Sequence, residues 1–150
     1  WDSKRCDKEK WVEICNDAVK KFNCKILVLW GPGDEIDAQF IKSKLKENCL
    51  LSPKSTLLQM AAIISKCNLI IANDSGPMHI SAALGIPTLG IFGPTNPKAH
   101  GPYSQNSDYI IKEDLDCIIC NKLICPLQHE CMRELDADLV IKKVSSLIKV

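Results

Sequence analysis

Side chains suited to chemistry gather at one turn of the chain, where Asp74 and His79 flank the start of a helix. Ser75 suits the N-cap of that helix, and Gly76 lets a ligand approach the backbone closely. The apolar run just before them, residues 69–72, is typical of a short buried parallel strand. The free N–H groups of such a helix start favour an anion, most often a phosphate. We therefore expect an anion site at this turn, with Asp74 and His79 as its polar neighbours.

Both polar neighbours also have a purely structural interpretation. Asp74 suits a turn because its side chain can bond to the nearby backbone, and His79 could face the core and donate to a carbonyl. Open α/β sheets bind their ligands outside the carboxyl ends of the strands, where Asp74 would lie. This position favours ligand contact for Asp74 clearly and for His79 only narrowly.

Four cysteines form a second group, Cys117, Cys120, Cys125 and Cys131. They give the ligand count of a tetrahedral zinc site or an iron–sulfur site, and the Cys-x-x-Cys pair supports either. His129 is a substitute ligand. The two longer spacings fit no standard zinc knuckle, so reduced thiols or a disulfide remain alternatives to a structural Zn or Fe–S group.

The length and amino-acid composition favour a single globular domain over a nucleic-acid-binding or membrane-spanning protein. The chain has 150 residues, 46% of them hydrophobic, and a formal net charge of +1. This length and hydrophobic content are enough for one domain with its own hydrophobic core. The net charge gives no sign of the basic surface that nucleic-acid-binding proteins use. No apolar run approaches the ~20 residues of a transmembrane segment. The start at Trp1 shows neither a signal peptide nor an initiator Met, so we expect an excerpt from a longer protein.

Cysteine usage indicates a reducing compartment. The nine cysteines are an odd number without a secretory signal, which favours the cytoplasm. Cysteines outside the cluster are expected to act as small core hydrophobes. They are Cys6, Cys15, Cys24, Cys49 and Cys67.

Apolar periodicity predicts alternating strands and helices, and hence a doubly wound, Rossmann-like α/β parallel sheet. Helices are expected over residues 7–22, 34–45, 56–66, 77–85 and 136–150, and strands over 26–30, 50–51, 69–72, 87–92 and 109–111. Residues 26–30, 69–72 and 88–92 should be interior strands of one sheet, because continuous apolar runs are typical of strands covered on both faces. Residues 93–107, rich in turn formers, predict a loop on the rim that holds Asp74.

Three motifs together resemble glycosyltransferase family 9, the bacterial heptosyltransferases that build the lipopolysaccharide inner core. They are Asp-Ser-Gly-Pro-Met-His at 74–79, Gly-Ile-Pro at 85–87 and Gly-Pro-Thr-Asn-Pro at 93–97. The opening at 1–5 is similar to the family's lysine-containing loop before a helix with an aromatic residue, here Trp11. Cys6 departs from the family pattern, which often has an aromatic residue after the basic pair.

The resemblance implies the GT-B architecture, in which two Rossmann-like domains face a cleft. This chain would be the C-terminal, nucleotide-sugar-binding half, with a core over 1–112, a Cys-rich segment over 113–135 and a C-terminal helix over 136–150. No catalytic residue is assigned to it, because the general base is expected in the missing N-terminal domain.

The resemblance also implies roles for individual residues. It puts Lys4 on the diphosphate, Glu35 on the ribose hydroxyls, Asp74 on the donor sugar's hydroxyls, and the amides of Ser75 and Gly76 on phosphate. A solvated lysine at Lys4 and a first-turn helix carboxylate at Glu35 are the structural alternatives. Thr95 is expected to shape its loop rather than to contact the ligand.

The function that follows from the resemblance is transfer of heptose from an ADP-heptose-like nucleotide sugar to the lipopolysaccharide core acceptor, with inversion. No cofactor is required, because Lys4 and the helix start would stabilise the leaving diphosphate. The enzyme would work at the inner face of the inner membrane, and the isolated domain would bind donor without turnover. The alternatives are a stand-alone nucleotide-binding or regulatory module, and a metal-stapled interaction domain that uses the cysteines.

Overall fold

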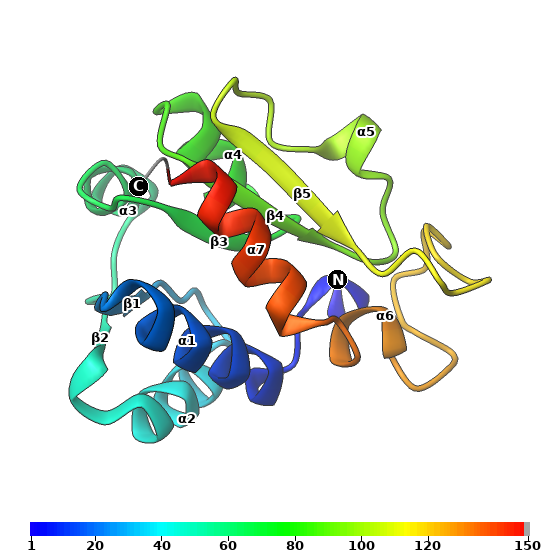
Figure 1. Cartoon of the computed structure of the whole chain (residues 1–150), viewed down its shortest axis with the longest axis horizontal. Coiled ribbons are helices and arrows are strands. Elements are labelled where there is room, and N and C mark those ends of the chain that lie inside the picture. Colours follow the sequence, from blue (N-terminus) through cyan, green and yellow to red (C-terminus); the bar gives the residue numbers. More distant parts are fainter. Residues whose placement is uncertain (149–150) are drawn as a thin grey trace.

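The structure is a computed structural model that describes residues 1–148, in which helices and strands alternate as the sequence predicts (Figure 1). The strands are β1 (Ile26–Val28), β2 (Cys49–Leu51), β3 (Ile70–Asn73), β4 (Thr88–Phe92) and β5 (Ser107–Ile111). The helices are α1 (Lys8–Phe22), α2 (Glu35–Leu45), α3 (Leu57–Ile64), α4 (Gly76–Ala83), α5 (Pro97–His100), α6 (Glu130–Arg133) and α7 (Ala137–Leu147). Two 3-10 turns are η1 (Asp2–Lys4) and η2 (Lys46–Asn48).

The strands run parallel in two separate ladders. In one, β4 lies between β3 and β5, with Thr88 opposite Ile70 and Ser107. In the other, β1 pairs with β2, with Ile26 opposite Cys49. The parallel α/β class is confirmed, but the expected sheet with three interior strands is wrong. Among the described residues, only β4 has a bonded strand on each side.

The error has a physical cause. A continuous apolar run indicates coverage by other elements, but it does not identify the strand that will be the hydrogen-bonding neighbour. β1 also ends at Val28, before the apolar run does. The run continues to Trp30, whose indole N–H donates to the carbonyl of Ser52 at 2.8 Å instead of joining a ladder.

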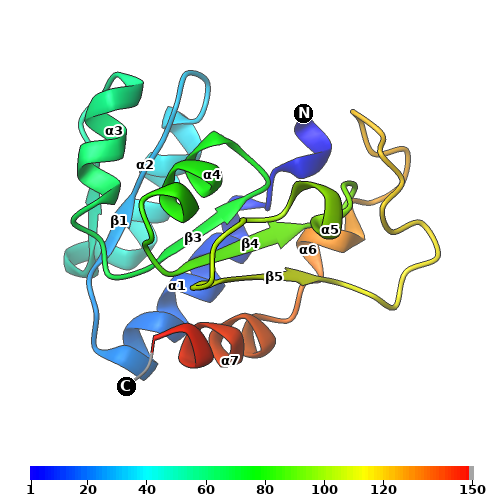
Figure 2. The same cartoon turned by 90° about the horizontal axis from the view of Figure 1, so that it is seen from above.

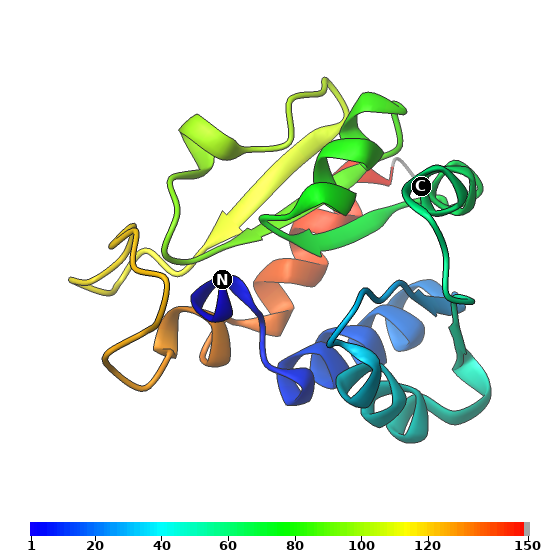
Figure 3. The ribbon, with the colours of Figure 1, turned by 180° about the vertical axis from the view of Figure 1, so that it is seen from behind.

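Helices cover both faces of the three-stranded ladder. α4 packs on β3 and β4 from one side, and α7 packs on β4 and β5 from the other (Figures 2 and 3). Gly90 makes the α4 side possible, because a Cβ there would lie 2.7 Å from the Met78 sulfur. α1 contacts both α7 and α2 and so joins the two ladders.

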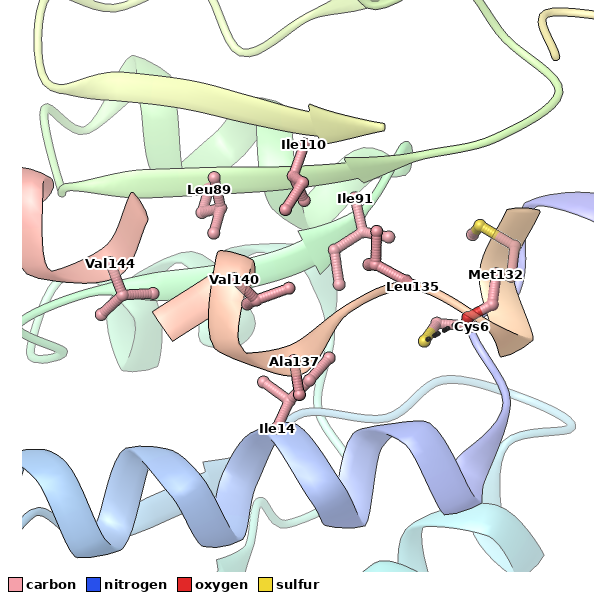
Figure 4. Close-up of a cluster of buried hydrophobic side chains, with 10 residues drawn as sticks. All are labelled: Cys6, Ile14, Leu89, Ile91, Ile110, Met132, Leu135, Ala137, Val140 and Val144. Carbon is pink, nitrogen blue, oxygen red and sulfur yellow. Dashed lines mark hydrogen bonds between the residues drawn. The ribbon is translucent and has the colours of Figure 1, made fainter. Parts of the chain in front are cut away.

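The main core lies between β4 and the helices α1 and α7 (Figure 4). Leu89 and Ile91, two residues apart on one face of β4, are fully buried. They belong to the same core cluster as Val140 and Val144 of α7 and Ile14 of α1. Burying each such side chain contributes about 1.5–3 kcal/mol. This core fixes β4 and therefore the loop that follows it.

Side chains cap the amino ends of α3 and α5. At Thr56 a capping box begins α3, with the Thr56 hydroxyl accepting from the Gln59 amide at 3.3 Å and the Gln59 side chain accepting from the Thr56 amide in return. Residues 93–107 are not only a loop, because Asn96 caps the short helix α5. No helix within residues 1–148 combines the length and apolar character needed to cross a bilayer.

Candidate functional site

Segments far apart in the sequence meet at the carboxyl ends of the strands. The turn after β1 (31–34), the turn after β3 (73–76) and the loop after β4 (93–96) all leave the sheets at this edge. The N-terminal segment (1–6) lies beside it in Figures 2 and 3 and is tied to it by ion pairs and hydrogen bonds. This is the edge at which open α/β sheets bind ligands.

Asp74 is the centre of these contacts and is only 8% exposed. The Lys4 Nζ lies 2.7 Å from Asp74 Oδ2, and the Thr95 hydroxyl donates to the same oxygen at 2.7 Å. The ammonium also lies 4.4 Å from the ring centroid of Trp1. Asp74 Oδ1 has no hydrogen-bond partner among residues 1–148. The carboxylate is therefore held in place through one oxygen, while the other can accept a bond from a ligand.

Thr95 has a more specific role than the sequence indicated. It was expected to shape its loop, and it does so by a buried side-chain bond to Asp74. Its position three residues beyond Phe92, on the rim that follows β4, was the signal for this contact. Such a bond to a charged acceptor is worth about 1.5–3 kcal/mol.

A second set of ion pairs joins the N-terminal segment to the start of α2. Arg5 pairs with Asp34 and lies 3.9 Å from Asp37 Oδ2. Glu35 follows Asp34 directly and is exposed as the first residue of α2. The structure thus brings Glu35 to the same edge as Lys4, without an ion pair of its own among the described residues. Its role toward a ribose stays a prediction.

Helix α4 presents its amino end at this edge. Ser75 occupies the N-cap position as predicted, but its hydroxyl donates to the Asn73 carbonyl at 3.0 Å and makes no cap bond. Among residues 1–148, neither the Ser75 nor the Gly76 amide donates to a protein carbonyl. These two N–H groups can therefore bind an anion.

His79 lies on the outer side of α4. The side chain is exposed, so the interpretation of His79 as a core residue is wrong. Its contact with a ligand remains a prediction.

Cys6, the departure from the family pattern, is a core residue. Its backbone N–H donates to the Asn73 side chain at 3.2 Å, and its thiol lies 3.8 Å from the Met132 carbonyl (Figure 4). Burial, with the nearby Asp7 charge as a lesser cause, raises the pKa of the Cys6 thiol to about 12. Cys6 therefore anchors the N-terminal segment against β3 as a neutral thiol.

The four clustered cysteines line one small cavity of about 10 Å³. They are Cys117, Cys120, Cys125 and Cys131, and all four are free thiols rather than the alternative disulfides. Burial first, and then the neighbouring Cys125, Cys117 and Cys120, raise the pKa of Cys131 to about 11. Within residues 1–148, no three His, Cys, Asp or Glu side chains stand in a metal-ligand arrangement.

His129 lines the same cavity but is already engaged. Its Nε2 lies 2.8 Å from the Ser3 carbonyl oxygen, and its Nδ1 lies 3.4 Å from an Asp7 carboxylate oxygen. Because both ring nitrogens have partners, the structure does not support His129 as a substitute metal ligand. It instead connects the Cys-rich segment to the N-terminal segment that carries Lys4.

Comparison with known proteins identifies relatives along most of the chain. Lipooligosaccharide heptosyltransferase 2 of Campylobacter jejuni is 37% identical over 107 residues, which are 71% of this chain and 33% of that protein. Lipopolysaccharide heptosyltransferase 1 of Pseudomonas aeruginosa is 29% identical over 128 residues, 85% of this chain and 36% of that protein. The chain thus spans well under half the length of these relatives.

Solved structures share the fold. The Escherichia coli ADP-heptose LPS heptosyltransferase II superposes with a TM-score of 0.80 at 22% identity, over 98% of this chain and 43% of that one. E. coli heptosyltransferase WaaC with ADP gives a TM-score of 0.77 at 22% identity, over 98% and 41%.

The family model of glycosyltransferase family 9 (heptosyltransferase) matches residues 1–130. This range includes the turn at Asp74, the loop at Thr95 and the N-terminal Lys4. The resemblance seen in the sequence motifs is thereby confirmed. The chain belongs to glycosyltransferase family 9.

Proposed function

We propose that this chain is the nucleotide-sugar-binding, C-terminal half of a GT-B heptosyltransferase. The full enzyme would transfer heptose from an ADP-heptose-like donor to the inner core of lipopolysaccharide. The contact of Lys4 and Thr95 with Asp74, beside the free amino end of α4, is the observation that carries the proposal. It places a cation, a buried carboxylate and unpaired amides at one sheet edge.

Each group has a chemistry that suits one part of the donor. The Lys4 ammonium and the amides of Ser75 and Gly76 favour the diphosphate, because they combine positive charge with free N–H donors. Asp74 Oδ1 can accept a bond from a sugar hydroxyl while Oδ2 stays with Lys4 and Thr95. Glu35, exposed at the start of α2, would accept from the ribose hydroxyls.

The reaction itself needs stabilisation of the leaving group. When the acceptor hydroxyl attacks the anomeric carbon, the bond to the diphosphate oxygen breaks and negative charge gathers on the departing ADP. Fixed donors at this edge would stabilise that charge without reorganisation and without a metal. We place the general base that takes the acceptor proton in a part of the enzyme outside this chain.

The names of the relatives favour this proposal over a stand-alone nucleotide-binding or regulatory module. Those relatives are heptosyltransferases, and the solved neighbours include E. coli heptosyltransferase WaaC with ADP and with ADP-2-deoxy-2-fluoro heptose. The donor class is proposed from the ligands of these neighbours, and a cytoplasmic place at the inner membrane face is part of the same proposal.

Calorimetry with ADP-heptose and with ADP tests the proposed roles. Asp74→Ala should weaken ADP-heptose binding by about 1.5–3 kcal/mol, the scale of hydrogen bonds to a charged group, and should affect ADP much less. Lys4→Ala should weaken both ligands, because both carry the diphosphate. Lys66→Ala is the matched control, since Lys66 is exposed before β3 at the opposite end of the strands.

Two outcomes would contradict these roles. Equal losses for ADP and ADP-heptose in Asp74→Ala would mean that the sugar does not contact this carboxylate. Unchanged binding of both ligands in Lys4→Ala would remove the diphosphate from this edge.

A further inference from the structure

The loop between β5 and α6, residues 112–129, has neither helix nor strand. Four of its large apolar side chains face solvent, among them Ile124, which is 73% exposed, and Leu127, which is 56% exposed, whereas Leu115 and Ile118 are partly buried. Three of the four clustered cysteines are instead partly buried, and only Cys120 is exposed. A loop that exposes its apolar residues gains little from hydrophobic burial. The loop therefore depends on interactions other than hydrophobic burial, such as its backbone hydrogen bonds.

The cysteines converge although three of them are spread along the loop and the fourth, Cys131, lies in α6. All four line the cavity described above, together with Gly93 of the loop after β4. Gly93 leaves room for this convergence, because a Cβ there would lie 2.7 Å from the Cys131 sulfur. The convergence therefore involves both the Cys-rich segment and the edge of the sheet.

The other possible ligands at the cavity are engaged elsewhere. Both nitrogens of His129 have partners, and a carboxylate oxygen of Glu130 accepts from the Gln128 amide at 3.2 Å. This leaves a set of four sulfurs, which is the ligand set of a structural zinc site. Cys117 and Cys120 supply the two-residue spacing that such sites use.

We propose that Cys117, Cys120, Cys125 and Cys131 together bind one Zn²⁺ ion. The cavity of about 10 Å³ favours a single ion over a four-iron cluster, because it has room for about one water-sized group. Four thiols lose their protons as the ion binds, and the four thiolates surround it as a tetrahedron. Because the described side chains do not stand in a ligand arrangement as they are, binding of the ion would have to bring the four sulfurs closer together.

The ion would position the groups that hold Asp74. The loop 112–129 bonds to the N-terminal segment through the Ser3 amide, which donates to the Leu123 carbonyl at 3.2 Å. It bonds to the loop after β4 through the Ile119 amide, which donates to the Gly93 carbonyl at 3.0 Å. Lys4 follows Ser3, and Thr95 lies two residues beyond Gly93, so the zinc site supports both partners of Asp74. Figures 1 and 3 show this loop beside the N-terminus.

The first test is the metal content of the protein purified without chelator. We expect about one zinc per chain and no stoichiometric iron. Zinc should be lost in Cys117→Ser and in Cys131→Ser and kept in Cys67→Ser, the matched control, because Cys67 is a partly buried thiol outside the cavity. Cobalt in place of zinc should give the absorption bands of a tetrahedral thiolate site, which a folded serine variant would lack.

A second measurement does not depend on the variants. Removal of zinc by a chelator should speed tryptic cleavage after Lys122, which is exposed in the loop, and added zinc should restore protection. Stoichiometric iron, a metal-free protein with unchanged protection at Lys122, or zinc that survives loss of either cysteine would each overturn the proposal. Because none of these readouts uses ADP, they are independent of the donor-binding proposal.

Discussion

Strand β4 and the loop 112–129 meet at Gly93, yet they differ in the burial of their apolar side chains. Every residue of β4 is buried, and Leu89 and Ile91 lie in the centre of the core. In the loop, large apolar residues such as Ile124 are exposed. The strand is thus held by hydrophobic burial, whereas the loop is held by a few hydrogen bonds and, on our proposal, by a metal ion.

This difference matters for the candidate site because both regions contribute to it. β4 places Thr95 on Asp74 directly, through the loop that follows the strand. The loop 112–129 acts on Lys4 from the other side, through Ser3. The hydrophobic core therefore positions Thr95 through β4. Lys4, on the other side of Asp74, is positioned by the loop 112–129, which is not part of that core.

The largest expected effect is on the core side. Leu89→Ala should lower the free energy of unfolding by about 2–5 kcal/mol, because Leu89 is fully buried and its truncation leaves a cavity. Denaturant unfolding followed by circular dichroism measures the change. A loss below about 1 kcal/mol would mean that the core around β4 can collapse onto the gap, and the contrast between the two regions would weaken.

Gly93→Ala tests the point where the two regions meet. The added methyl would lie 2.7 Å from the Cys131 sulfur and 3.0 Å from the Met132 sulfur, so both must shift. Such overpacking costs about 1–3 kcal/mol of unfolding free energy. On the zinc proposal the metal content should fall as well. Gly76→Ala is the control for stability, since a Cβ there meets nothing within 4 Å. Equal stability of the two variants would show that Cys131 has room to move.

The smallest effect is expected in the loop. Ile124→Ala should change the free energy of unfolding by no more than about 0.5 kcal/mol, because the side chain is 73% exposed. The same denaturant experiment applies, with Leu89→Ala as the contrasting variant. A loss comparable to that of Leu89→Ala would show that apolar contacts hold the loop, and the need for a metal would disappear.

Local patterns in the sequence determined the type of fold and the position of the site. Periodicity predicted nearly every long helix and strand, and the residues at 73–76 predicted a strand-to-helix turn, because these signals depend on neighbours a few residues apart. The motifs also identified the family, and the family resemblance pointed to Lys4 and Glu35 as candidate donor-binding residues.

Tertiary structure decided the contacts between residues far apart in the chain. Within residues 1–148, β1 pairs with β2 only, since an apolar strand does not specify its neighbour. Folding brought Lys4 and Thr95 to the same oxygen of Asp74 and turned His79 outward. The cysteine spacing gave a possible ligand set, but only the packing of loop 112–129 against Gly93 showed that all four cysteines line one cavity. No local pattern could specify these contacts, because each depends on where the core places separate segments.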